Sequence, residues 1–121
     1  MKTHKVLICD DNEGIRESLK LILGDYYDLI LTSDGAQCLE CLKGSQDIGL
    51  ILLDIKMPKV DGLEMLKTIK RKYPALSVVM ITGYQTVEAA SEASHLGACG
   101  YITKPFKTEE ILETVKKNLE K

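Results

Sequence analysis

Hydrophobic residues along this chain form five short runs, which alternate with five longer segments whose apolar residues recur at helical spacing. A short apolar run bounded by turn residues is typical of a strand, and apolar residues at i, i+3, i+4 and i+7 are typical of an amphipathic helix. We expect strands at residues 6–9, 28–31, 48–53, 76–81 and 99–103. We expect helices at residues 12–24, 36–44, 62–72 and 86–96, and a last one around 111–119.

The third run, Ile48–Leu53, is almost wholly apolar and does not alternate with polar residues. Such a strand is buried on both faces, as in the middle of a parallel sheet. Alternating strands and helices predict an α/β domain with right-handed crossovers. The favoured arrangement is a flavodoxin-like (βα)5 doubly wound sheet, with five parallel strands in the order 2-1-3-4-5. A length of 121 residues fits a single domain spanning residues 1–121.

Acidic residues follow two of the expected strands, with Asp10 and Asp11 after the first and Asp54 after the third. In a doubly wound sheet, ligands bind beyond the carboxyl ends of the strands where the strand order reverses, here between these two strands. Clustered carboxylates repel one another and are costly to desolvate unless paired. A divalent cation removes this cost, and Mg²⁺ suits the position because it is usually held by one or two carboxylates. The sequence therefore predicts a Mg²⁺ site formed by these three residues.

Two further polar residues come at the ends of the remaining strands. Thr82 follows the fourth strand and supplies a hydroxyl, and Lys104 follows the fifth and supplies an ammonium group. Around a carboxylate, these groups would neutralise the equatorial oxygens of an incoming phosphoryl group, which is most of what phosphoryl transfer requires. Asp54 is the best candidate nucleophile because it ends the most apolar strand, and an aspartyl phosphate is a recognised covalent intermediate.

Each of these residues has a simpler explanation when taken alone. Asp10 and Asp11 could cap the following helix, although a cap needs only one carboxylate. Thr82 could be a turn residue, and Lys104 could be a surface lysine. Their convergence on one edge of the predicted sheet favours a site.

Four segments carry a resemblance to a known family. They are Asp10-Asp11, Asp54-Ile-Lys-Met-Pro58 continuing to Asp61-Gly62, Ile81-Thr82-Gly83, and Gly100-Tyr-Ile-Thr-Lys-Pro-Phe106. In this order, and each at a strand end, they resemble the receiver domains of bacterial two-component response regulators, from about Lys5 to the C-terminal helix. The residues around Thr82-Gly83-Tyr84 resemble receivers of the NtrC type.

The resemblance implies a role for each matching residue. Asp54 would be the phosphoacceptor. Asp11, Asp54 and the backbone carbonyl of Lys56 would bind Mg²⁺ directly, and Asp10 would act mostly through water. Thr82 and Lys104 would hold the phosphoryl oxygens.

The same resemblance implies a switch and a docking surface. Tyr101, which could otherwise be an ordinary strand aromatic, would change rotamer with phosphorylation. The Lys104–Pro105 bond would be cis, and the side chains of Lys56 and Tyr84 would tune the lifetime of the phosphoryl group. The kinase would dock around the first helix and the Pro105 loop. The docking residues would include Asn12, Gly14, Ile15 and Phe106.

The resemblance predicts a regulatory phosphoacceptor that catalyses only its own phosphorylation and dephosphorylation. A sensor histidine kinase or a histidine phosphotransfer protein would donate the phosphoryl group from a phosphohistidine to Asp54. The face formed by the fourth helix, fifth strand and fifth helix would then change, and a phosphorylation-dependent homodimer is a further expectation. Because the chain ends at Lys121, no output domain is expected within it. The sequence leaves open a stand-alone receiver, a piece of a hybrid kinase and the first domain of a transcription factor.

Two other functions fit parts of the pattern. A Mg²⁺-dependent phosphohydrolase of the haloacid dehalogenase type would share the clamp chemistry, but it places its nucleophile after the first strand and adds a cap domain. A flavodoxin-like cofactor binder would share the fold. However, Asp10 and Asp11 would repel a phosphate at the loop after the first strand, where such a protein needs phosphate-binding groups.

The composition of the chain argues against two further classes of protein, nucleic-acid-binding and membrane-spanning. The net charge of −2 gives the chain no electrostatic reason to bind nucleic acid, and the apolar runs are too short to cross a membrane. Because no signal segment opens the chain, we expect a cytoplasmic protein. The four cysteines are Cys9, Cys38, Cys41 and Cys99. We interpret them as structural thiols, with Cys9 and Cys99 as small hydrophobic residues in strands.

Overall fold

The computed structural model describes residues 4–44 and 47–119. Five parallel strands form the main sheet: β1 (Lys5–Cys9), β2 (Asp28–Thr32), β3 (Ile48–Leu53), β6 (Ser77–Thr82) and β7 (Gly100–Thr103). Their order is β2-β1-β3-β6-β7, which is the predicted order once the separate β4–β5 ribbon is left out of the count. The predicted domain limits, residues 1 and 121, lie outside the described residues.

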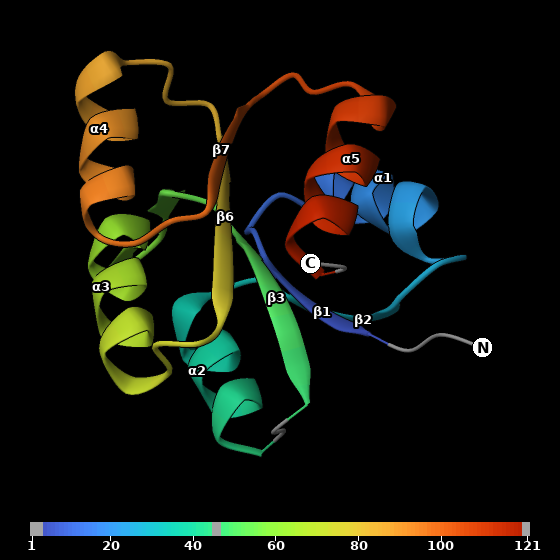
Figure 1. Cartoon of the computed structure of the whole chain (residues 1–121), viewed down its shortest axis with the longest axis horizontal. Helices are drawn as coiled ribbons and strands as arrows, with labels where there is room; N and C mark the ends of the chain where they lie inside the picture. Colours follow the sequence, from blue (N-terminus) through green and yellow to red (C-terminus); the bar gives the residue numbers. More distant parts are fainter. Residues whose placement is uncertain (1–3, 45–46, 120–121) are drawn as a thin grey trace.

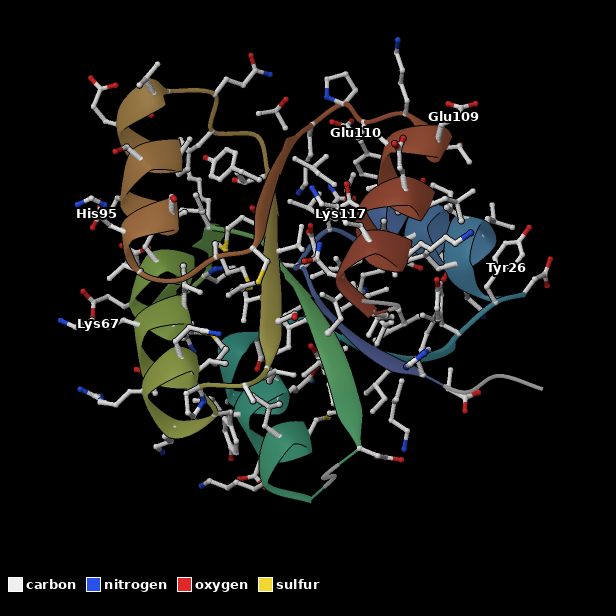
Figure 2. The ribbon with its side chains drawn as sticks, in the orientation of Figure 1. Tyr26, Lys67, His95, Glu109, Glu110 and Lys117 are labelled. Carbon is white, nitrogen blue, oxygen red and sulfur yellow. The ribbon has the colours of Figure 1, made fainter. Side chains whose placement is uncertain are left out.

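The helices cover both faces of the sheet. They are α1 (Glu13–Leu23), α2 (Gly35–Gly44), α3 (Gly62–Lys72), α4 (Val87–His95) and α5 (Thr108–Leu119). Helices α1 and α5 lie on one face, and α2, α3 and α4 lie on the other (Figure 1). Charged side chains such as Lys67 and Glu109 point outward from the helices (Figure 2). Within the described part of the chain, no helix combines the length and apolar character needed to cross a bilayer.

Strand β3 shows why its sequence lacks polar alternation. Its side chains point to opposite faces in turn, so that Leu50 and Leu52 pack in the core beneath α1 and α5. Ile51 and Leu53 pack in the second core, beneath α2, α3 and α4. All four are at most 2% exposed, which confirms the prediction of a strand buried on both faces.

Polar side chains fix where three helices begin. The side chain of Asn12 caps α1 by accepting a hydrogen bond from the Ile15 N–H at 2.9 Å. Asp61 caps α3 by accepting from the Leu63 N–H at 2.8 Å, and Thr86 caps α4. These caps set the start of each helix just beyond a loop at the carboxyl edge of the sheet.

Two features differ from the prediction. The loop after β3 contains a two-stranded antiparallel ribbon, β4 (Lys56–Met57) with β5 (Val60–Asp61), whose turn places Lys59 at φ 66°. Two-residue strands are too short to show periodicity, so hydrophobic patterning does not predict them. In addition, Cys99 is exposed and lies just before β7, so the expectation of a strand cysteine is wrong there.

Candidate functional site

The polar residues expected at the strand ends meet at the carboxyl edge of the sheet. Asp10 follows β1, Asp54 follows β3, and Thr82 is the last residue of β6. These three are unusually buried for polar residues, with exposures of 2%, 5% and 0%, whereas Asp11 is exposed. Burial of polar groups in this way requires partners, and the partners define the chemistry of the site.

The three carboxylates form one cluster. An oxygen from each of Asp10, Asp11 and Asp54 lies within 4.8 Å of the other two. Carboxylate oxygens are the donors that Mg²⁺ prefers, and a small group of them fits such an ion. The donor set therefore fits a divalent cation of this kind.

Lys104 is the counter-ion within the cluster. Its Nζ lies 2.8 Å from Asp10 Oδ2 and 3.1 Å from Asp54 Oδ2. Burial would lower the pKa of Lys104, but the hydrogen bonds and charges of Asp10 and Asp54 outweigh it, so the pKa lies above its ordinary value. Burial raises the pKa of Asp10, and its hydrogen bond with Lys104 offsets this only in part. One ammonium against three carboxylates leaves an excess of negative charge, which a cation would reduce.

Backbone contacts hold the two buried carboxylates in place. The Asn12 N–H donates to Asp10 Oδ1 at 2.9 Å, and the Lys56 N–H donates to Asp54 Oδ1 at 3.4 Å. Gly62 lies so close to the end of β3 that a Cβ there would overlap the carbonyl oxygen of Asp54. This close approach explains why Asp61-Gly62 accompanies Asp54 in the sequence motif.

Sequence reasoning missed one residue that supports this loop. Arg16 Nη1 donates to the backbone carbonyl of Asp10 at 2.8 Å. Arg16 lies four residues after the cap Asn12, so the two fall on the same side of α1. The four-residue spacing from Asn12 is the sequence feature that could have predicted the contact of Arg16 with this loop.

The residues of β6 and β7 contact a different loop. Thr82 Oγ1 accepts from the Tyr84 N–H at 3.3 Å, and the Tyr101 hydroxyl donates to the Tyr84 carbonyl at 2.9 Å. The Gln85 side chain donates to the Lys104 carbonyl at 2.9 Å, a contact for which the sequence offered no signal. Burial raises the pKa of Tyr101, and the charge of Asp54 acts in the same direction. The Lys104–Pro105 bond is cis, as predicted.

These groups open onto a single cleft of about 630 Å³. Its walls include Asp11, Asp54, Thr82 and Lys104, together with the β4 residue Lys56. The cleft therefore joins carboxylate, hydroxyl and ammonium groups from four separate strand ends. Such a set can hold a cation and an oxyanion side by side.

Comparisons with known proteins agree with this arrangement. The family model described as the response regulator receiver domain matches residues 6–116. Sporulation initiation phosphotransferase F of Bacillus subtilis is 35% identical over 120 residues, which cover 98% of this chain and 96% of that protein. The DNA-binding transcriptional regulator NtrC of Escherichia coli is 36% identical over 113 residues, but this chain spans only 24% of its length.

Solved structures give the same result. The chain is similar to a CheY-like receiver domain protein from Methanospirillum hungatei, with a TM-score of 0.92 and 30% identity over 98% of this chain and 95% of that one. The BeF3-activated receiver domain of DrrB matches with a TM-score of 0.90 and 26% identity, covering 100% of both chains. The chain therefore belongs to the response regulator receiver domain family, the phosphoacceptor modules of two-component signalling.

Proposed function

We propose that Asp54 is the residue of this receiver that accepts the phosphoryl group, in a Mg²⁺-dependent reaction. The observation that carries the proposal is the position of Lys104, whose ammonium contacts both Asp54 and Asp10 while Asp11 lies within reach of the same carboxylates. This arrangement sets a nucleophile beside a fixed positive charge and a set of metal ligands.

The metal-binding roles are those that the resemblance to receiver domains implies, and the cluster of Asp10, Asp11 and Asp54 supports them. Asp11, Asp54 and the backbone carbonyl of Lys56 would hold Mg²⁺, with Asp10 acting mostly through water. When bound, the ion offsets negative charge on the phosphoryl oxygens.

The remaining roles in the reaction belong to Asp54, Lys104 and Thr82. A carboxylate oxygen of Asp54 forms a bond to phosphorus as the bond between phosphorus and the donor's histidine nitrogen breaks. Lys104 then pairs with one phosphoryl oxygen, and the Thr82 hydroxyl donates to another. Because the phosphoryl group stays on the chain, the protein acts as a regulatory phosphoacceptor and its only catalysis is its own phosphorylation and dephosphorylation.

The switch uses the contacts of Tyr84. When Thr82 turns toward the phosphoryl group, it gives up its hydrogen bond from the Tyr84 N–H. The loop that carries Tyr84 then shifts, and Tyr101, which donates to the Tyr84 carbonyl, follows it. Phosphorylation needs only to favour one pre-existing arrangement by a few kcal/mol. The face formed by α4, β7 and α5 changes its preference for a partner, including a second copy of this chain.

The partners follow from the family and the site. A sensor histidine kinase or a histidine phosphotransfer protein donates the phosphoryl group in the cytoplasm. The surface of this chain on which that donor docks includes Asn12 and Gly14, which are exposed. It also includes Ile15 and Phe106, which pack only partly into the core. NtrC-type regulators, in which a receiver forms about a quarter of the length, supply one model for the output.

Incubation with acetyl phosphate and Mg²⁺, followed by intact-mass measurement, tests this proposal. The wild-type protein should gain the mass of one phosphoryl group, and the gain should disappear when EDTA removes the metal. Asp54→Asn should show no gain, whereas Asp61→Asn, which changes the last residue of β5, should label normally. Labelling that persists in Asp54→Asn and survives acid would contradict the assignment.

A further inference from the structure

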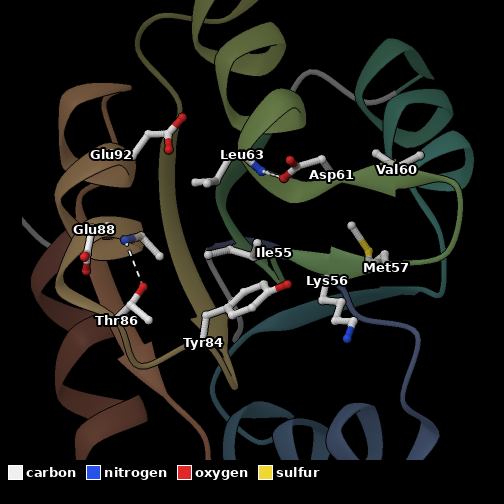
Figure 3. Close-up of a pocket in the computed structure, with 11 residues that line it drawn as sticks. Ile55, Lys56, Met57, Val60, Asp61, Leu63, Tyr84, Thr86, Glu88 and Glu92 are labelled. Atoms are coloured by element: carbon white, nitrogen blue, oxygen red, sulfur yellow. Dashed lines mark hydrogen bonds between the residues drawn. The ribbon is translucent and has the colours of Figure 1, made fainter.

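A second hollow lies beside the cleft, between the β4–β5 ribbon and α3 on one side and α4 on the other (Figure 3). Its volume is about 600 Å³. Apolar side chains line much of it, among them Ile55, Met57 and Leu63. We call this hollow the α3–α4 groove. It lies on the α3 side of α4.

The charged groups of the groove are mainly acidic. Glu88 and Glu92 come from α4, where a spacing of four residues places them one turn apart on one face of the helix. Asp61 lies across the groove and already caps α3, and Lys56 is the one cation among the lining residues. Within residues 4–44 and 47–119, the carboxylates of Glu88 and Glu92 make no ion pair or hydrogen bond.

Helix stability explains only part of this acidity. Glu88 lies in the first turn of α4, where a negative charge interacts favourably with the helix dipole. Glu92 lies beyond that turn and gains no such benefit. The lining residue Tyr84 is 43% exposed, and Val87, which precedes Glu88 in the chain, is 81% exposed. An apolar floor with two unpaired carboxylates along one wall is complementary to a cationic amphipathic segment.

We propose that the α3–α4 groove docks a helical segment of a partner protein that carries two lysine or arginine residues one turn apart. An apolar side chain of the segment enters between Ile55 and Leu63, and its two cations pair with Glu88 and Glu92. The groove is small, so the complex is a weak and transient one.

The groove also adjoins the proposed phosphorylation site. Lys56, Met57 and Tyr84 line both hollows. In Figure 3, the Tyr84 hydroxyl points across the groove toward Lys56. A shift of Tyr84 on phosphorylation would therefore change the groove, and a bound segment would in turn change the affinity of the cleft for its ligand. This coupling rests on the proposed function, but docking itself does not.

The test is an NMR titration of the ¹⁵N-labelled full chain, free of phosphate analogues, with a synthetic helical peptide. The peptide contains only leucine and lysine, with leucines at i, i+3, i+4 and i+7. We expect saturable shifts of the Leu63, Ala89 and Glu92 amides. A peptide with glutamate in place of every lysine should cause none of them. Shifts spread evenly over the surface, or absent from these amides, would overturn the proposal.

Charge reversal supplies a matched control. Glu109 and Glu113 on α5 have the same spacing and are also exposed, but they lie on the other face of the sheet (Figure 2 labels Glu109). Glu88→Lys with Glu92→Lys should weaken peptide binding at least about fivefold, as expected for two exposed ion pairs. The same change at Glu109 and Glu113 should leave the affinity unaltered. Equal losses in the two double variants would overturn the proposal.

A milder pair of substitutions guards against unfolding of α4. Glu88→Gln with Glu92→Gln removes the charges without placing cations at the start of the helix, and it should give an intermediate loss of affinity. Addition of beryllofluoride then tests the coupling separately. If the peptide binds equally well with and without beryllofluoride, docking stands and the coupling is refuted.

Discussion

The two halves of the site are held in different ways. In the half formed by the ends of β1 and β3, backbone N–H groups fix Asp10 and Asp54, and Arg16 fixes the carbonyl of Asp10. In the half formed by β6 and β7, Thr82 and Tyr101 each make one hydrogen bond to the same exposed residue, Tyr84. Lys104 connects the halves through its ion pairs.

In the proposed mechanism, this difference separates the chemical step from the conformational switch. Groups that attack or bind a metal work best when their geometry is fixed in advance, and the acidic half meets that requirement. Groups that report on the reaction must exchange partners at low cost, and single hydrogen bonds to a surface loop allow that. Four experiments test whether the two halves differ in this way, and the change with the strongest predicted effect comes first.

Loss of Lys104 should have the largest effect because this residue serves both halves. In Lys104→Ala, the rate of labelling by acetyl phosphate should fall about 100-fold, the usual cost of removing one group that stabilises developing charge. The rate is measured by intact mass against time. The control is Lys107→Ala, which removes an exposed lysine close by in the chain. A rate within a factor of about two of the wild type would show that Lys104 has only a structural role.

Loss of the Thr82 hydroxyl should have a smaller effect. Thr82→Val keeps the shape of this fully buried side chain but removes its donor. The labelling rate should fall about tenfold, in line with the value of a hydrogen bond to a charged group. Thr82→Ser, which restores a hydroxyl, should recover most of the rate. Equal rates in the two variants would contradict a donor role.

Mg²⁺ should stabilise the fold through the acidic half. At ten times its dissociation constant, a ligand that binds only the folded state adds about 1.4 kcal/mol to the free energy of unfolding. Urea unfolding with and without Mg²⁺ measures this gain. Asp11→Asn should lose most of it, whereas Glu17→Gln, which changes an exposed carboxylate on α1, should keep it. Equal gains in both variants would place the metal elsewhere.

Loss of the Tyr101 hydroxyl should have the smallest effect. Tyr101→Phe removes one hydrogen bond to the Tyr84 carbonyl, worth about 1 kcal/mol or less at an exposed position. The labelling rate should stay unchanged, because the acidic half is intact. The amide shifts that beryllofluoride causes at Tyr84 and Gln85 should shrink. A large fall in the labelling rate would show that the two halves do not act separately.

The hydrophobic pattern predicted the limits of a strand or helix well where a charged residue or a proline marks its end. Strand β3 and helix α3 have the predicted limits, because Asp54 ends the one and Pro74 closely follows the other. The strand order followed from general rules for doubly wound sheets. The gathering of Asp10, Asp11 and Asp54 followed from the same rules, since the carboxyl ends of neighbouring parallel strands share an edge.

The remaining details depend on contacts between distant residues. Nothing in the sequence distinguishes the buried Asp10 from the exposed Asp11, because the difference arises from packing against Lys104 and Asn12. The β4–β5 ribbon is too short to show a pattern, yet it forms a wall of both hollows. The bond from Gln85 to Lys104 joins two loops that only the folded chain brings together.

The position of the phosphoryl group on the chain decides whether Asp54 is the phosphoacceptor. Borohydride reduces an aspartyl phosphate to homoserine, so the labelled position can be read by peptide mass spectrometry. After treatment with acetyl phosphate and Mg²⁺, homoserine should appear at position 54 and at no other aspartate, and EDTA should prevent its formation. Homoserine at position 10, 11 or 61 with an unreduced Asp54 would show that Asp54 is not the phosphoacceptor.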